Sequence, residues 1–502
     1  MIKKIILNNK YFWLILIIIF LLSRTATWFF PYDSDHWLFY YVGRIWAQGG
    51  NLYISAWDHK PPIIFAINAL MHILFYDNLI IHRVFFTIIS ITGAYFFYQL
   101  AKQIFSQLFN KNNLFLARLS LILYVFWTNL SQFTNSGNNT ENFAILFIIL
   151  MFFLYIKHHE NKKLLYLFAS GICWAIIFWL KPNLIILSLP IWTDLIFFNK
   201  LTTQKSSTIF HIVKSSLVFI LPWILLSSYW FFYFQSKNTF SDFIIASFSF
   251  SSRYMASALQ GNVSNQLIFI AILLLFLVPF MFFILVYLKN NLRAWVANFY
   301  HRIIFFSIIS ALLFILISGS YYTYYYLVIL PFLILATCAS LPHLKSNKFS
   351  KLISVIFIFS IILNFSISTR QLYNNFWGLA KITSENDCKV ANYIKSNTSD
   401  TDTILSYTYG ATFFQLIKKN SGSRYISASH LLLDERDDYG FGLTDTYIQD
   451  IKISKPIYLI FPNPDTHLYY LYTQNKKATD FLLENYKLEK SFKDYSVYKI
   501  NK

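Results

Sequence analysis

Long apolar runs dominate this chain and restrict what it can fold into. Runs of 17 to 25 residues recur along the first 369 of the 502 residues, separated by short basic segments. About 20 apolar residues in an α-helix cross a hydrocarbon core roughly 30 Å thick. The sequence therefore predicts a polytopic α-helical membrane protein, and a hydrophobic share of 56% agrees with that class.

The distribution of charge explains the net charge of +19 without nucleic acid. Lysines and arginines lie in short loops between the apolar runs, which is the bias expected of cytoplasmic loops in membrane proteins. The three cysteines, Cys173, Cys338 and Cys388, provide neither a disulfide framework nor a cysteine metal site. We therefore expect an integral membrane protein that does not bind nucleic acid.

The apolar runs predict about eleven transmembrane helices. The first follows Lys3, Lys4 and Lys10 and is longer than the apolar region of a signal peptide, so we expect it to be retained. An odd number of spans with basic loops inside places the tail from Arg370 outside the cytoplasm. The expected helices lie near 11–30, 80–101, 114–133, 142–157, 164–180, 183–199, 212–234, 265–288, 303–319, 324–341 and 352–369.

One apolar segment, 63–75, is too short for a span, because thirteen helical residues rise only about 20 Å. We expect an interfacial or re-entrant helix there, which leaves 31–79 as one large external loop. A second external loop covers 235–265. Residues 1–369 then form the transmembrane domain.

The composition changes at 370–502, which holds 15 of the 23 acidic residues in shorter apolar runs. We expect a small extracytoplasmic α/β domain, with a polar loop over 430–445. The predicted strands are 403–409, 424–429, 456–462 and 495–500, and the predicted helices lie near 385–397, 411–419 and 477–486.

Acidic residues gather in the first external loop. The first 369 residues contain only eight, and four of them, Asp33, Asp35, Asp58 and Asp77, fall in or near it. Asp33 and Asp35 precede a helical pattern, so one of them can cap that helix while the other serves chemistry. A membrane protein that otherwise has few acids is expected to use such a cluster as a site, with a carboxylate as general base or metal ligand.

Basic residues near this loop suit a phosphate group. Lys60 precedes a rigid Pro61-Pro62, Arg83 lies near the start of a helix, and Arg253 lies in the second external loop. Glu141 follows Asn138-Asn139-Thr140 at another external turn and is a further candidate for substrate binding.

The order of these elements resembles the C-type membrane glycosyltransferases, particularly bacterial relatives of protein O-mannosyltransferases and of the transferases that add aminoarabinose to lipid A. The resemblance covers the whole chain: an acidic motif, Gly-x-x-Tyr, Lys-Pro-Pro, and a returning helix that opens with arginine. The matching positions are Asp35, Gly43, Gly50, Tyr53, Asp58, Lys60, Pro61, Pro62 and Arg83.

Two positions depart from the pattern of that family. Where relatives often show His-Tyr shortly before a late proline, this chain has Thr323-Tyr324-Tyr325-Tyr326, so no histidine ligand is carried over. Ser34 separates Asp33 from Asp35, whereas the family's acidic pair is often adjacent. His36 and His59 flank acids but complete no ligand set of recognisable spacing, and a divalent metal requirement stays open.

The resemblance implies an enzyme of the bacterial inner membrane that moves a sugar from a polyprenyl-phosphate donor to a lipid, polysaccharide or protein acceptor on the non-cytoplasmic face. It implies Asp35, with Asp33, as catalytic residues and a reaction that inverts the anomeric centre. The alternatives are an O-antigen polymerase or ligase and a non-enzymatic lipid or polysaccharide transporter. A transporter is expected to carry more ionisable residues in mid-span. The sugar, the acceptor and the oligomeric state are not fixed by the sequence.

Overall fold

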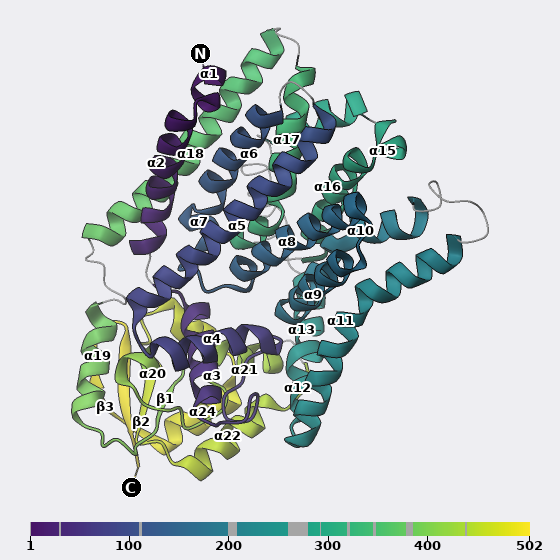
Figure 1. The fold of residues 1–502 in the computed structure, drawn as a ribbon. Helices are drawn as coiled ribbons and strands as arrows, with labels where there is room; N and C mark the ends of the chain where they lie inside the picture. The colour runs from purple at the N-terminus through teal and green to yellow at the C-terminus, as the bar shows by residue number, and fades with distance from the viewer. Residues whose placement is uncertain are drawn as a thin grey trace. The chain divides into compact units, whose positions relative to one another are not determined.

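The computed structural model divides the chain into two compact units (Figure 1). Unit 1 comprises 1–30, 83–230 and 259–377, and unit 2 comprises 31–82, 231–258 and 378–502. The described residues are 2–29, 32–109, 113–198, 208–259, 280–291, 293–318, 322–344, 348–377, 385–436 and 439–501.

Unit 1 is built from apolar helices. Five helices of the described residues, α2, α5, α8, α11 and α16, contain windows long and apolar enough to cross a membrane. Helices α5 and α11 each continue into unit 2. The elements are α1 (Ile2–Leu7), α2 (Asn9–Phe29), α5 (Leu79–Leu108), α6 (Asn113–Thr128), α7 (Ser131–Thr134), α8 (Thr140–Asn161), α9 (Leu164–Leu180), η1 (Pro182–Ser188), α10 (Leu189–Thr193), η2 (Asp194–Phe198), α11 (Thr208–Ser236), Phe280–Asn291, α15 (Ala294–Ala297), α16 (Phe299–Ser318), η5 (Thr323–Val328), α17 (Leu330–Ser340), η6 (Leu341–His343) and α18 (Lys348–Trp377).

These helices coincide with the predicted spans, with several differences. The segments expected as single helices over 114–133 and 324–341 are each divided, into α6 and α7 and into η5 and α17. The segment expected as one helix over 183–199 is divided into η1, α10 and η2, since Pro182 and Pro190 each lack an N–H donor. The expected helix 265–288 is described only from Phe280 onward, and its first part lies outside the described residues. The last helix continues to Trp377, eight residues beyond its expected end at 369.

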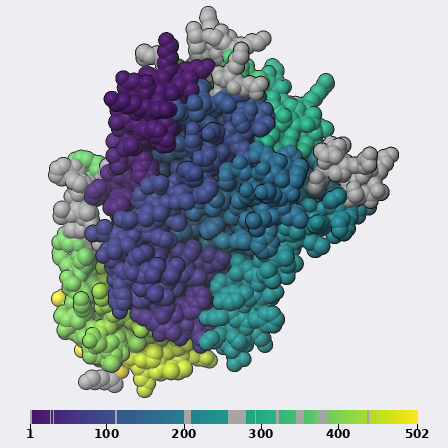
Figure 2. Space-filling view, viewed as in Figure 1, coloured from purple at the N-terminus to yellow at the C-terminus, as the bar shows by residue number. Residues whose placement is uncertain are grey.

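Unit 2 gathers both predicted external loops with the C-terminal residues. Helices α3 (Ser34–Ala47) and α4 (Pro62–Phe75) pack together, and α3 also contacts α20 (Thr412–Ile417). In the lower part of Figure 2, purple atoms of the first loop border green and yellow atoms of the C-terminal residues. From the second loop come α12 (Phe240–Ile244), η4 (Ile245–Phe250) and α13 (Ser251–Leu259).

Gly43 explains why α3 and α4 approach so closely. A Cβ added at Gly43 would lie 2.6 Å from the Asn68 Cβ and 2.7 Å from the Ala69 backbone nitrogen, so no side chain fits there. The opposite face of α4 exposes Leu70, Ile73 and Leu74, which recur at the spacing of one helix face. A short helix with one face packed and one apolar face exposed fits the interfacial helix that the sequence predicts.

The C-terminal part of unit 2 forms a four-stranded sheet in the order β1-β2-β4-β3. Strand β1 (Ile404–Ser406) runs parallel to β2 (Tyr458–Pro462), while β4 (Tyr495–Ile500) is antiparallel to both β2 and β3 (Tyr486–Ser491). Every residue of β2 is buried, as expected for a central strand. The helices of this part are α19 (Glu385–Ser396), α20, α21 (Ala428–Arg436), α22 (Leu443–Ser454), α23 (His467–Tyr472) and α24 (Lys476–Asn485).

The strand predicted over 424–429 is wrong. Arg424 binds Asp450 with both its backbone N–H (3.0 Å) and its guanidinium (3.2 Å), and its carbonyl accepts from the Trp57 N–H at 2.9 Å. This segment therefore pairs with the first loop instead of joining the sheet, and α21 begins at Ala428.

The loop predicted over 430–445 is also wrong, because α21 and the start of α22 occupy most of it. Local hydrogen bonds hold this segment in place. The Asp434 carboxylate accepts from the Phe441 N–H at 2.9 Å and from the Leu443 N–H at 2.8 Å, which satisfies backbone donors at the start of α22. Asp437 and Asp438, which belong to the predicted loop, lie outside the described residues.

Asp77 ties the first loop to the C-terminal residues. Its carboxylate accepts from the Tyr40 hydroxyl at 2.8 Å and the Gln415 amide at 3.1 Å, and Lys418 lies 3.5 Å away. Partial burial alone would raise the pKa of Asp77, but these hydrogen bonds and the charges of Lys418 and Arg44 bring it below its ordinary value. Asp77 is thus held ionised as a structural link between α3 and α20.

Candidate functional site

The two aspartates of the acidic motif occupy different positions on α3. Asp33 is the N-cap, and its side chain accepts from the His36 N–H at 2.8 Å. Asp35 lies in the first helical turn and is partly exposed. Negative charge is favoured at a helix N-terminus, so both carboxylates suit this position, but Asp33 already has the capping role. Asp35 therefore remains the better candidate for chemistry.

The Gly-x-x-Tyr motif supports the loop that carries Lys60. A Cβ at Gly50 would lie 2.7 Å from Ile45 Cγ2 and 2.9 Å from its carbonyl oxygen, so the tight turn after α3 requires glycine. Tyr53 is buried with φ of 69°, and its hydroxyl donates to the Lys60 carbonyl at 2.8 Å. The same hydroxyl lies 3.1 Å from Ser247 Oγ of the second loop. The tyrosine thereby fixes the backbone directly before Pro61-Pro62.

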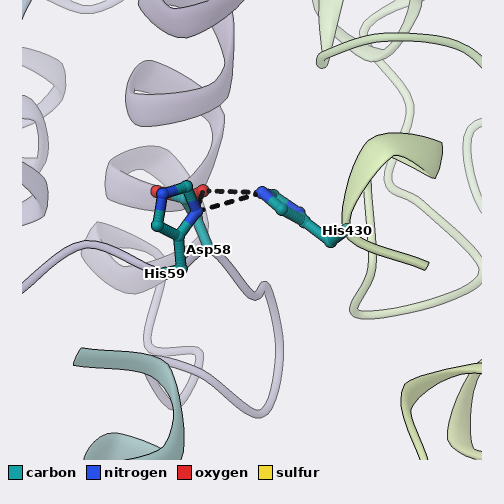
Figure 3. Close-up of side chains that lie close together, drawn as sticks. All are labelled: Asp58, His59 and His430. Carbon is teal, nitrogen blue, oxygen red and sulfur yellow. Dashed lines mark hydrogen bonds and ion pairs between the residues drawn. The ribbon is translucent and has the colours of Figure 1, made fainter. Parts of the chain in front are cut away.

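Asp58 and His59 meet a histidine from the C-terminal residues (Figure 3). Asp58 Oδ1 lies 3.2 Å from His59 Nδ1 and 3.2 Å from His430 Nε2, in the first turn of α21. The two ring nitrogens are themselves 3.2 Å apart. Lys60 Nζ lies 2.5 Å from His59 Nε2. Since Asp58 has 0% exposed surface, it would reach a substrate only if the loop moved.

The members of this cluster differ in their protonation states. Burial would raise the pKa of Asp58, but the neighbouring His59, His430 and Lys60 together hold it well below its ordinary value. Burial lowers the pKa of His59 to about 4, and the nearby Lys60 ammonium acts in the same direction. At neutral pH Asp58 is therefore a carboxylate and His59 a neutral imidazole, which leaves Lys60 as the cation of the loop.

Arg83 is engaged at the end of another helix. Its guanidinium donates to the carbonyls of Thr27, at 2.8 Å, and of Trp28, both in the last turn of α2. These carbonyls have no partner within their own helix, and an arginine near a helix C-terminus commonly satisfies them. The structure gives Arg83 this role, and phosphate binding by Arg83 stays a prediction.

Unit 1 contains a second charged cluster, at the start of α8 and the end of α9. Glu141, in the first turn of α8, accepts from Lys181 Nζ at 2.5 Å and from the Thr140 hydroxyl at 2.8 Å. Lys181 caps the end of α9, and its ammonium lies 3.3 Å from the centroid of the Tyr325 ring. The sequence drew attention to the segments of Glu141 and Tyr325 separately, and the fold brings them together around Lys181.

Arg253 is exposed on α13 and lies over the Phe441 ring, 5.0 Å from its centroid. Of the predicted site residues, Asp33, Asp35, Asp58, Lys60 and Arg253 belong to unit 2, whereas Arg83 and Glu141 belong to unit 1.

His430 is the residue that the sequence did not indicate. It lies 371 positions after His59 in a segment expected to be a loop, and nothing in its local sequence marks it as a ligand.

The fold of this chain is similar to the folds of several solved proteins. ArnT from Cupriavidus metallidurans in the apo state matches 97% of this chain and 96% of its own, with a TM-score of 0.58 at 11% identity. ArnT bound to undecaprenyl phosphate matches 97% of each chain, with a TM-score of 0.54 at 12% identity.

The archaeal oligosaccharyltransferase AglB from Archaeoglobus fulgidus, in complex with an inhibitory peptide and a dolichol-phosphate, matches 96% of this chain and 74% of its own, with a TM-score of 0.56 at 11% identity. No curated protein matches this chain by sequence.

A family assignment follows from fold and sequence together. Residues 59–230 match the dolichyl-phosphate-mannose-protein mannosyltransferase family. Together with the fold shared with ArnT and AglB, this match supports assignment of the chain to the C-type membrane glycosyltransferases, the family that the order of its motifs indicated.

Proposed function

We propose that this protein transfers a sugar from a polyprenyl-phosphate donor to an acceptor on the non-cytoplasmic face of the membrane. The observation that carries the proposal is the family match over 59–230, which begins at the His59-Lys60-Pro61-Pro62 turn and includes Arg83 and Glu141. The solved relatives bound to undecaprenyl phosphate and dolichol-phosphate support a donor of the same chemical class.

In the proposed reaction an acceptor oxygen attacks the anomeric carbon while the bond from that carbon to the phosphate oxygen breaks. The polyprenyl phosphate leaves with the bonding electrons, and Asp35 takes the acceptor proton. A phosphate monoester has a second pKa near 6, so it departs without the general acid that a glycosidase requires. A single displacement of this kind inverts the anomeric centre.

Asp35 and Lys60 have different tasks in this mechanism. Asp35 is the partly exposed carboxylate of the motif, and Asp33 is its neighbour and potential substitute. The Lys60 ammonium neutralises the donor phosphate and gains further as negative charge develops on it. Arg253, exposed in the same unit, is a second candidate for that charge, and Arg83 and Glu141 are candidates from unit 1.

The test uses purified protein in liposomes with a polyprenyl-phosphate sugar as donor. Asp35→Asn should lower the catalytic rate by about 10²–10⁴-fold with little effect on donor binding. Lys60→Ala should weaken donor binding as well as rate. Asp445→Asn, a change at an acid in α22, is the matched control and should leave both unchanged.

Near-normal turnover by Asp35→Asn and by the double variant with Asp33→Asn would remove this motif as the source of the base. An acceptor that is itself a phosphate needs little deprotonation, so the comparison should include a hydroxyl acceptor.

A further inference from the structure

The cluster of Asp58, His59 and His430 has the composition of a metal site. Its three ligand atoms are a carboxylate oxygen and two imidazole nitrogens, which all lie within 4.8 Å of one another. Figure 3 shows both imidazole rings turned toward the Asp58 carboxylate. Imidazole and carboxylate are the common protein ligands of zinc outside cysteine sites.

The distances fit tetrahedral coordination. Each pair among Asp58 Oδ1, His59 Nδ1 and His430 Nε2 is 3.2 Å apart. In a tetrahedral site with bonds of about 2.0–2.1 Å, neighbouring ligand atoms lie about 3.3–3.4 Å apart. The three atoms therefore form nearly the triangle that one face of a zinc tetrahedron requires, with a fourth position left for water or another ligand.

The surroundings of the carboxylate also suit a cation. Asp58 has 0% exposed surface, and its Oδ2 makes no hydrogen bond to any of the described residues. A buried carboxylate oxygen without a partner is costly, and a bound cation would compensate it. Trp57 and Phe250 pack against the His430 ring at 5.0 Å and 5.9 Å between centroids, which limits solvent access to the site.

The loop that carries the ligands is held in place by hydrogen bonds independent of the three side chains. Ser251 Oγ donates to the His59 carbonyl at 2.8 Å, and the Trp57 N–H donates to the Arg424 carbonyl at 2.9 Å. The loop that carries the ligand atoms is thus held in place before a metal ion binds, which favours tight binding.

We propose that Asp58, His59 and His430 bind one divalent transition-metal ion, with Zn²⁺ as the best fit, and that this ion fastens the Lys60 loop to α21. Metal on His59 Nδ1 leaves the imidazole proton on Nε2, the atom that faces Lys60 Nζ at 2.5 Å. Two donors cannot share that position, so the metal displaces the Lys60 ammonium from the ring. Metal binding and the Lys60–His59 contact therefore exclude each other.

The experiment measures metal binding by the full chain, purified in detergent without a polyhistidine tag. After treatment with chelator, Zn²⁺ is added and the excess removed, and bound zinc is counted by elemental analysis. We expect about one ion per chain. Co²⁺ as a second probe should give visible absorption typical of a four-coordinate site, and Zn²⁺ should abolish it.

Variants locate the site. His430→Gln and His59→Gln should each reduce bound zinc to near zero, and His467→Gln, at an exposed histidine of the same unit, should leave it unchanged. Lys60→Met should bind zinc at least as tightly as the unaltered chain, since it removes the competing ammonium. Zinc should raise the melting temperature of the unaltered chain, of His467→Gln and of Lys60→Met, but not that of His430→Gln or His59→Gln.

Equal zinc content in His430→Gln and the unaltered chain would overturn the proposal, as would the absence of zinc from a chain with a normal melting transition. Weaker binding in Lys60→Met would overturn the exclusion between lysine and metal. None of these measurements involves sugar transfer. A negative result for zinc binding therefore does not affect the proposed reaction, and a negative result for sugar transfer does not affect the proposed metal site.

Discussion

Removing Lys181 should destabilise the membrane unit far more than removing an exposed lysine. The Lys181–Glu141 pair is 2.5 Å long, with side chains 11% and 1% exposed. At an effective dielectric constant of 20, two unit charges at that distance attract by about 6–7 kcal/mol, most of which offsets the cost of removing both from water. Lys181→Met leaves Glu141 buried without its cation and also removes the ammonium from the Tyr325 ring. We expect the free energy of unfolding to fall by about 3–5 kcal/mol.

The assay is unfolding in detergent, followed by circular dichroism, with Lys157→Met as the matched control. Lys157 lies 3.8 Å from Glu160 in an exposed pair, and Glu160 keeps hydrogen bonds from Gln103 and Tyr300 when the lysine is gone. That change should cost no more than about 0.5 kcal/mol.

The double variant Lys181→Met with Glu141→Gln should be more stable than the sum of the single effects by about 1–3 kcal/mol, because it leaves no unpaired charge. Equal effects of Lys181→Met and Lys157→Met, or strict additivity in the double variant, would refute the view that this pair is buried and coupled.

Three further changes test other parts of the structure. Gly43→Ala should lower stability by about 1–3 kcal/mol through overpacking between α3 and α4, and thermal unfolding as stable as that of the unaltered chain would contradict the close approach at Asn68. Asp77→Asn should destabilise at neutral pH. Because the folded pKa of Asp77 lies below the unfolded value near 3.9, its contribution is complete above about pH 5 and is lost as pH falls through the folded pKa. The difference in melting temperature should therefore shrink on acidification, and a constant difference would count against the assignment. Cysteines at the exposed positions Asn51 and Asn78 should both react with an impermeant reagent from outside, whereas reaction of only one would make α4 a span.

The membrane helices could be predicted from the sequence because the signal depends on length and composition alone. A run of apolar residues long enough to cross a bilayer has few alternatives, since its backbone must be hydrogen-bonded internally. The division of 183–199 was not predicted, although Pro182 and Pro190 marked the places where helix geometry would change. The C-terminal residues gave weaker signals, because strands of three to six residues compete with turns of similar composition.

Strand β3 is the clearest example of an element that the sequence alone does not indicate. Its sequence from Tyr486 to Ser491 reads Tyr-Lys-Leu-Glu-Lys-Ser, and only Tyr486 is buried. Such a segment lacks the apolar face that identifies a strand and is suited to a sheet edge, where lysine discourages pairing with other chains. It becomes a strand because β4 pairs with it, and that partner is known only once the fold is known.

The candidate site likewise contains residues that the sequence alone indicated and contacts that only the fold reveals. Residues whose chemistry is local, such as the cap at Asp33 or the Lys60-Pro61-Pro62 turn, could be picked out because charge and backbone restriction are visible in the sequence. The contacts that give Asp58 its surroundings come from α21, through His430, and from the second loop, through the aromatic Phe250. Trp57, three residues before Lys60, contacts both Phe250 and His430, so we expect changes in either distant segment to affect this loop, although neither segment belongs to the motif. The first loop thus carries most of the candidate site residues, while contacts that position them come from segments about 190 to 370 residues further along the chain.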